Sequence, residues 1–198
     1  MARGACQNRW KMEGLAGSRR RIAMETHFRC IVTGRGPEGR SFVAEDRQVP
    51  PGPLGIYDFW LTEKVPAPVG GPDLLSGRPT RLEPPPGGSV FRYFLIPPQD
   101  PSLTPEAAER AAQEAFAAAG AAHCRVDTRL NPMMHTTRSV DYVVVLRGEV
   151  TLLLDEGRVT LKPFDAVVQR GTNHYWINEG KEPALLLGVL LDAEPWQK

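Results

Sequence analysis

Short β-like runs separated by turn residues dominate the second half of the chain, and they constrain its fold more than any other feature. Beyond residue 135, runs of apolar and β-branched residues recur about every 8–12 positions. They cover residues 141–146, 149–154, 158–161, 166–168, 175–178 and 184–191. Between the second and third of these runs, Asp155-Glu156-Gly157 is a hairpin signal. Many short strands at this spacing are typical of an all-β sandwich or closed barrel.

The first half of the chain alternates β-like runs with proline-rich loops. The runs cover residues 28–32, 41–44, 56–61 and 90–96. The chain has 19 prolines and 19 glycines in 198 residues, which argues against a long helical bundle. Because proline removes a hydrogen-bond donor from a sheet, we expect these strands to be short and to lie at edges or between long loops.

One segment of the chain has the pattern of an α-helix. Thr104 is a suitable N-cap, Pro105 occupies the first helical position, Glu106 lies in the first turn, and Gly120 ends the segment. The residues between are rich in alanine and bury little apolar area. The sequence therefore predicts one peripheral helix on an otherwise all-β domain.

Charge is distributed unevenly along the chain. Residues 1–23 hold six bases and one acid, a local charge of +5 within a chain whose formal net charge is +1. We interpret them as a basic, disordered extension that could precede a true start at Met24; a targeting peptide or an arm that binds polyanions is the alternative. The remaining residues carry a net charge of −4, which favours no nucleic-acid partner.

The cysteine content and the apolar runs restrict where the protein acts. Three cysteines, at positions 6, 30 and 124, are too few and too scattered for a disulfide framework, so we expect a reducing, cytoplasmic location. The longest apolar run, residues 184–191, is much shorter than the ~18–20 residues that cross a membrane. We therefore predict a soluble protein without a membrane partner.

The candidate site begins with a histidine and an aspartate on one face of a predicted strand. In an extended chain His135, Thr137, Ser139 and Asp141 point to the same side, because side chains alternate with a period of two. The two valines that follow at this parity make that face apolar, so it should turn inward. A buried histidine and aspartate are costly unless they pair with each other or with a metal. This cost is the physical reason to expect a site.

The segment His135-x-Thr137-x3-Asp141-x6-Gly148 resembles the first motif of the cupin superfamily, in which two histidines and a glutamate bind a metal. The spacing holds from His135 to Gly148, but the glycine that opens the family's motif is missing, since Arg129 stands at its position. Threonine replaces the second histidine, and aspartate replaces the glutamate.

The segment Gln169-x-Gly171-x2-His174-x3-Asn178 is similar to the second cupin motif, which supplies one further histidine. Glutamine replaces the usual proline at its start. The chain is most similar to single-domain "cupin 2, conserved barrel" proteins, and within these to a bacterial and fungal group with His-x-Thr-x3-Asp-Tyr and Gln-Arg-Gly-Thr-Asn-His segments. Some fungal members of that group are described as oxidoreductases.

The resemblance implies a double-stranded β-helix, or jelly-roll barrel, with an N-terminal extension of strands and loops. Residues 24–122 would pack on a barrel core formed by residues 123–194. It also implies a homodimer and a small-molecule ligand or substrate. His135, Asp141 and His174 would hold one divalent metal ion, a donor set that suits Fe(II), Mn, Ni or Zn.

Other residues receive supporting roles. Thr137 and Gln169 would hold a metal-bound water or orient the ligands, and Trp176 and Arg92 would line the substrate pocket. The function predicted from these features is a metal-dependent enzyme: an oxygenase or other oxidoreductase, an isomerase, a dehydratase or a decarboxylase. A non-catalytic ligand-binding or sensor protein is the alternative. It would follow if the polar residues form a closed network without metal, or if Asp141 pairs with a base such as Arg92 or Arg170.

Overall fold

The computed structural model describes residues 27–196, so the extension predicted over residues 1–23 lies outside the described residues. Ten strands and one α-helix, α1 (Pro105–Ala118), form the described part. The strands are β1 (Phe28–Arg35), β2 (Ser41–Val49), β3 (Ile56–Thr62), β4 (Ser89–Ile96), β5 (Ser139–Arg147), β6 (Val150–Leu154), β7 (Arg158–Leu161), β8 (Ala166–Arg170), β9 (His174–Ile177) and β10 (Ala184–Asp192). Short 3-10 turns cover Pro53–Gly55 and Ala122–Cys124.

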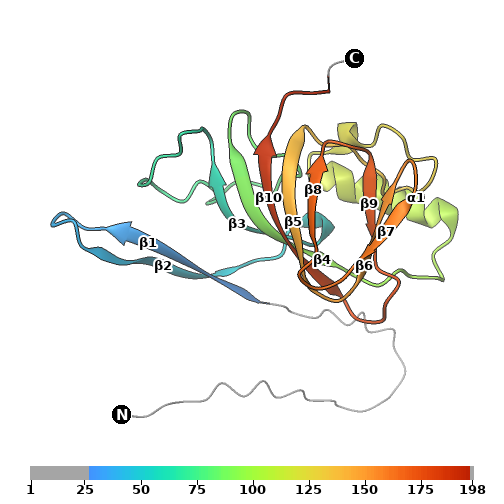
Figure 1. The fold of residues 1–198 in the computed structure, drawn as a ribbon, viewed down its shortest axis with the longest axis horizontal. Coiled ribbons are helices and arrows are strands. Elements are labelled where there is room, and N and C mark those ends of the chain that lie inside the picture. The colour runs from blue at the N-terminus through green and yellow to red at the C-terminus, as the bar shows by residue number, and fades with distance from the viewer. Residues whose placement is uncertain (1–26, 197–198) are drawn as a thin grey trace, which may run out of the picture.

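The strands form the two facing sheets of a double-stranded β-helix, with a separate hairpin (Figure 1). One sheet has the order β3-β4-β10-β5-β8 and the other the order β7-β6-β9, and every pair is antiparallel. The predicted all-β fold with one helix is confirmed. The hairpin predicted at Asp155-Glu156-Gly157 joins β6 to β7, with Gly157 at a positive φ of 88°.

Apolar side chains from both sheets fill the space between them, which we call the interior. The alternation of β5 aims Val143 and Val145 inward, while Tyr142 on the same strand is half exposed. The core cluster consists of Val143, Val145, Val150, Leu152, Leu161, Trp176, Ala184 and Leu186. Burial of these side chains is the main force that holds the sheets together.

Strands β8 and β9 are longer at their facing ends than the apolar pattern predicts. β8 continues through Gln169 and Arg170, and β9 begins at His174. Main-chain pairing causes the difference: Gln169 lies opposite Asp141 of β5, and His174 opposite Leu154 of β6. Ladder hydrogen bonds do not depend on whether the side chain is apolar, so polar residues continue these strands.

Helix α1 packs at the periphery, as predicted. The Thr104 hydroxyl accepts a hydrogen bond from the Ala107 N–H (3.3 Å), and Gly120 follows the helix with a positive φ of 63°. Ala112 and Phe116 are the buried residues on the inner face of the helix. Within residues 27–196, no helix is both long enough and apolar enough to cross a bilayer.

The β1–β2 hairpin extends from the body on the side of β3, away from α1 (Figure 1). Near the start of β1, Phe28 makes edge contacts with the rings of Tyr57 and Tyr93, at centroid distances of 4.8 and 5.0 Å. These aromatic residues lie on the side of β3 and β4 that faces away from the interior, where Phe59 joins them. The base of the hairpin therefore packs on the outer face of the large sheet near its edge, while the rest of the hairpin projects from the body (Figure 1).

Candidate metal centre

The polar residues expected to share a face converge at one end of the interior. On the approach to β5 and along it, Thr137, Ser139 and Asp141 are all buried, and each is at most 5% exposed. Gln169 and His174, from β8 and β9, are buried beside them. The same inward face is thus apolar at Val143 and Val145 and polar from Asp141 back to Thr137.

His135 and His174 pair directly through their backbones. The N–H of each residue donates to the carbonyl of the other, at 3.0 and 2.9 Å, in an isolated β-bridge just outside β5. Their rings lie 4.4 Å apart between centroids. Phe116 of α1 packs on the His135 ring, and Trp176 packs edge-on against the His174 ring. Backbone pairing and aromatic packing therefore hold the two imidazoles next to each other.

Both imidazoles are anchored through Nδ1. Nδ1 of His135 lies 2.9 Å from the Met133 carbonyl, and Nδ1 of His174 lies 2.9 Å from the Thr172 carbonyl. A carbonyl can only accept, so each Nδ1 carries the proton and each Nε2 keeps its lone pair. This is the tautomer that metal-binding histidines adopt when a carbonyl orients them.

Gln169 fixes the loop that precedes His174. Its Nε2 donates to the carbonyl and the hydroxyl of Thr172, at 2.9 and 2.6 Å, and lies 3.0 Å from Nδ1 of His174. The two hydrogens on Nε2 are used by Thr172, which leaves Nδ1 of His174 as a donor to the same carbonyl. Gln169 therefore acts on His174 mainly through Thr172.

Burial keeps both histidines neutral. It lowers the pKa of His174 to about 3, with a smaller contribution from the neighbouring His135, and it also lowers the pKa of His135. Neutral imidazole is the form that binds a metal ion. At neutral pH both side chains are thus ready to act as ligands.

Asp141 is the buried carboxylate next to this pair. Within residues 27–196 its Oδ1 has no hydrogen-bond partner. Burial raises the pKa of Asp141 to about 6, although a hydrogen bond from Ser139 and the charge of Arg92 oppose the rise. The Ser139 hydroxyl has one proton to give, and it also points at Thr137 Oγ1 at 2.9 Å. The carboxylate is therefore only partly satisfied, which is the condition expected of a group that binds a ligand.

Arg92 is held by other residues rather than by Asp141. Its Nε lies 2.9 Å from Asp58 Oδ1, an ion pair whose geometry is not that of a hydrogen bond. Its other nitrogens donate to the carbonyls of Leu82 and Arg81, both at 2.8 Å. The guanidinium lies at the wall of a cleft of about 290 Å³ that Asp58 and Leu82 also line. Arg170, the other base considered for Asp141, stacks on Trp196.

Trp176 lies deeper, in the apolar core cluster, where it contacts the His174 ring. It therefore lies where the apolar core cluster meets the polar end of the interior.

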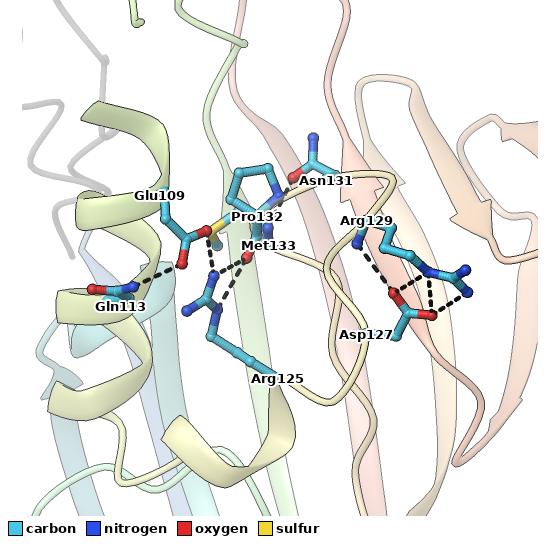
Figure 2. A network of polar contacts seen from close by, with 8 residues as sticks. All are labelled: Glu109, Gln113, Arg125, Asp127, Arg129, Asn131, Pro132 and Met133. Carbon is cyan, nitrogen blue, oxygen red and sulfur yellow. Dashed lines mark hydrogen bonds and ion pairs between the residues drawn. The ribbon is translucent and has the colours of Figure 1, made fainter. Parts of the chain in front are cut away.

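A network of polar contacts positions the loop that leads to His135 (Figure 2). Arg125 pairs with Glu109 of α1 at 2.7 Å and donates twice to the Pro132 carbonyl, at 3.0 and 2.9 Å. The Asn131 side chain accepts the N–H of Met133 at 2.8 Å. Since Met133 in turn accepts from His135 Nδ1, the helix is linked to the imidazole through the loop.

The metal donors are not preassembled at coordination distance. His135, Asp141 and His174 do not bring their ligand atoms within 4.8 Å of one another. Over the described 27–196 range, the group that meets this distance is Glu83, His123 and Cys124. The orphaned Asp141 oxygen and the two anchored imidazoles fit a cation by their chemistry, and binding would have to draw the carboxylate and the imidazoles together.

The sequence patterns did not single out the second group, in which His123 lies at the surface. Its side chain is indeed exposed, yet its Nε2 lies 2.8 Å from Glu83 Oε2 and 3.6 Å from the buried Cys124 thiol. The adjacent His-Cys pair was the available signal. Glu83 precedes it by 40 residues, and nothing local links the two segments.

Residues 126–190 match the family model described as "Cupin domain". The match begins ahead of His135 and ends within β10, so it includes both histidines and Asp141. Strands β3 and β4, which complete the large sheet, lie outside it.

Curated relatives from fungi match the same third of the chain. "Phomopsin biosynthesis cluster protein D" of Diaporthe leptostromiformis is 48% identical over 65 residues, which cover 32% of this chain and 34% of that protein. "Oryzines biosynthesis cluster protein J" of Aspergillus oryzae is 47% identical over 66 residues, 32% and 37% of the two chains. "Cupin-domain-containing oxidoreductase virC" of Hypocrea virens is 39% identical over 66 residues, 31% and 34%. The aligned part spans about a third of the length of these relatives.

Among solved structures, a "Cupin 2 conserved barrel domain protein" from Salinispora arenicola CNS-205 overlaps 62% of this chain and 71% of its own, with 12% identity and a TM-score of 0.33. Both values are low, so the assignment of the family rests on the domain match and on the motif residues placed above. Residues 126–190 of this chain are a domain of the cupin family.

Proposed function

We propose that this chain is a metal-dependent enzyme that acts on a small organic molecule, with one divalent cation held by His135, His174 and Asp141. One observation carries the proposal: two neutral imidazoles, that of His174 buried and that of His135 partly buried, are each anchored through Nδ1 and lie at the same end of the interior as a carboxylate whose Oδ1 has no hydrogen-bond partner among residues 27–196. Two imidazoles and one carboxylate suit Fe(II), Mn, Ni or Zn, with coordination positions left for substrate.

A bound cation would supply Lewis-acid chemistry, or dioxygen chemistry if it is iron. The side chains would do the rest. Without a cation the pKa of Asp141 is about 6, so its carboxylate is mostly ionised at neutral pH and could bind the cation. Thr137 and Gln169 would orient a water molecule and the His174 loop. Trp176 and the valines of β5 would keep bulk water from the reacting atoms.

Within this proposal we favour an oxidoreductase over an isomerase, a dehydratase or a decarboxylase. The preference is supported by the names of several fungal relatives, which are called cupin-domain-containing oxidoreductases. The matched region covers only a third of those proteins. A homodimer, a cytoplasmic location and the absence of a nucleic-acid partner stay predictions from the sequence.

A non-catalytic ligand-binding protein is the second candidate. Two observations favour it: threonine at the position of the second motif histidine, and donor atoms of His135, Asp141 and His174 that do not all lie within 4.8 Å of one another. In that case the polar end of the interior would bind an organic ligand without metal.

Metal content separates the two candidates. Protein loaded anaerobically with Mn(II) or Fe(II), desalted and analysed by plasma mass spectrometry should hold about one ion per chain. His174→Ala and His135→Ala should lose it, whereas His123→Gln, at an exposed histidine outside the interior, should keep it. No retained ion in the wild-type protein, or equal retention in all variants, would overturn the enzyme proposal. Thermal stabilisation by organic ligands without metal would then support the second candidate.

A further inference from the structure

A second group of metal-ligating side chains lies outside the interior, at the end of α1. It contains Glu83, His123 and Cys124, whose ligand atoms all lie within 4.8 Å of one another. We propose that Glu83 Oε2, His123 Nε2 and Cys124 Sγ form a Zn(II) site that is independent of His135, Asp141 and His174. Carboxylate oxygen, imidazole nitrogen and thiolate sulfur are the three donor types that zinc takes from proteins.

The distances agree with tetrahedral zinc. With Zn–N of about 2.0–2.1 Å and Zn–S of about 2.3 Å, a tetrahedral site separates the nitrogen and sulfur ligands by roughly 3.6 Å. His123 Nε2 and Cys124 Sγ lie 3.6 Å apart. His123 Nε2 and Glu83 Oε2 lie 2.8 Å apart, a hydrogen bond that would widen by roughly half an ångström when zinc replaces the shared proton.

The fold brings these two distant segments together. Gly120 ends α1 at a positive φ, and the Arg81 side chain occupies the space that a Cβ at Gly120 would need. The Leu82 N–H donates to the Ala119 carbonyl at 3.2 Å, which fixes the segment before Glu83 against the helix end. On the other side, the Cys124 carbonyl accepts the N–H of Thr136 at 2.8 Å. Backbone hydrogen bonds therefore fix the segments that carry all three ligands.

Glu83 is also oriented and His123 is accessible, whereas the Cys124 thiol is buried behind them. Oε1 of Glu83 accepts the backbone N–H of Arg138 at 2.8 Å, which leaves Oε2 directed at His123. An outer partner of this kind is typical of metal-binding carboxylates. The His123 side chain is 66% exposed, and Glu83 lines the cleft of about 290 Å³. Because His123 is exposed and Glu83 lines the cleft, a zinc ion held by these three ligands would keep a fourth position for water or a small molecule, as in catalytic zinc sites.

Cobalt(II) distinguishes this site from the interior one, because thiolate bound to Co(II) gives an intense near-ultraviolet charge-transfer band and imidazole or carboxylate does not. The full chain carrying Cys6→Ser and Cys30→Ser leaves Cys124 as the single thiol. Titrated with Co(II), this protein should develop a band that corresponds to one thiolate-bound Co(II) per chain and is complete by two equivalents, because the interior site can take the other ion, and Zn(II) should abolish it. His174→Ala in the same background should leave the band unchanged.

Three variants test the ligands one at a time. Cys124→Ser should remove the band completely. His123→Gln and Glu83→Gln, which alter partly or fully exposed side chains and leave the core intact, should each weaken Co(II) binding by about 100-fold or more. A band that survives in His123→Gln with unchanged affinity, or Co(II) that binds the parent without any thiolate band, would overturn the site. Since His174 and Asp141 are intact in these variants, this result is independent of the enzyme proposal.

Discussion

The two ends of the interior are built on the same strand and differ in what they contribute. At one end of β5, Val143 and Val145 pack with Leu186 and other apolar side chains from both sheets. At the other end, Thr137, Ser139 and Asp141 occupy the same inward face, and one oxygen of the Asp141 carboxylate has no hydrogen-bond partner in the part of the chain that the structure describes. The apolar end stabilises the fold. The polar end costs stability, and such a cost is expected where a site is specified for binding.

Truncation at the apolar end should have the largest effect on stability. Leu186 is fully buried, so Leu186→Ala should lower the free energy of unfolding by about 2–5 kcal/mol. Mn(II) stoichiometry should not change. Val168→Ala on the exposed face of β8 is the matched control and should cost less than about 0.5 kcal/mol. Chemical denaturation measures both variants; equal effects at the two positions would remove the apolar end from its assigned role.

Acidification should destabilise the metal-free protein through the polar end. The pKa of His174 is about 3 in the folded protein, whereas the ordinary value of 6.5 applies to the unfolded chain. As the pH falls, the unfolded chain therefore takes up this proton before the folded protein does. The contribution of His174 to the free energy of unfolding is therefore fully present above pH 6.5 and is lost as the pH falls towards 3. Denaturation from about pH 7 to about pH 5 tests this before most surface carboxylates titrate. His174→Gln should flatten the dependence, and an unchanged slope would contradict it.

Asp141→Asn should stabilise the metal-free protein at alkaline pH, because Asp141 depends on pH in the opposite sense to His174. The folded pKa of Asp141 is raised from 3.8 to about 6, so its ionised form is disfavoured in the folded protein, and its contribution to stability is lost as the pH rises through about 6. At about pH 8 Asp141→Asn should stabilise the metal-free protein by about 1–3 kcal/mol and weaken Mn(II) binding. Asp141→Asn should also make the free energy of unfolding fall more steeply on acidification, because the opposing contribution of Asp141 is removed.

The matched control for Asp141→Asn is Glu156→Gln, at an exposed position in the turn between β6 and β7. It makes the same change in net charge and should alter neither property. Destabilisation by Asp141→Asn at about pH 8 would mean that the carboxylate has a partner that stabilises the fold.

The smallest effect is expected at the network of Figure 2. Arg125→Met removes both donors to the Pro132 carbonyl and should cost about 1 kcal/mol, with a modest loss of Mn(II) affinity because the His135 loop is less fixed. Arg129→Met is the control, since that guanidinium contacts Asp127 from an exposed position and should matter little. If both variants behave alike, the link from α1 to His135 has no role in positioning the histidine.

The sequence predicted what depends on local pattern. Alternation gave the strands and placed Thr137, Ser139 and Asp141 on one inward face, and the capping residues gave α1. The resemblance to cupins supplied His174 as the partner of His135, and their backbone bridge places them together. The sequence could not show that Arg92 forms its ion pair with Asp58 rather than with Asp141. It also could not show that Glu83 lies next to His123 and Cys124. Both arrangements depend on contacts between segments that are distant in sequence. The pattern of residues within one segment does not indicate which other segment will pack against it.

The most direct test of the central claim is an anomalous-difference map from crystals soaked with Mn(II). We predict a peak between Nε2 of His135 and Nε2 of His174, on the side of the Asp141 carboxylate, and its absence in crystals of His174→Ala. A map without density at the polar end, or with Mn(II) confined to Glu83, His123 and Cys124, would contradict the claim that the interior of this cupin domain holds a metal.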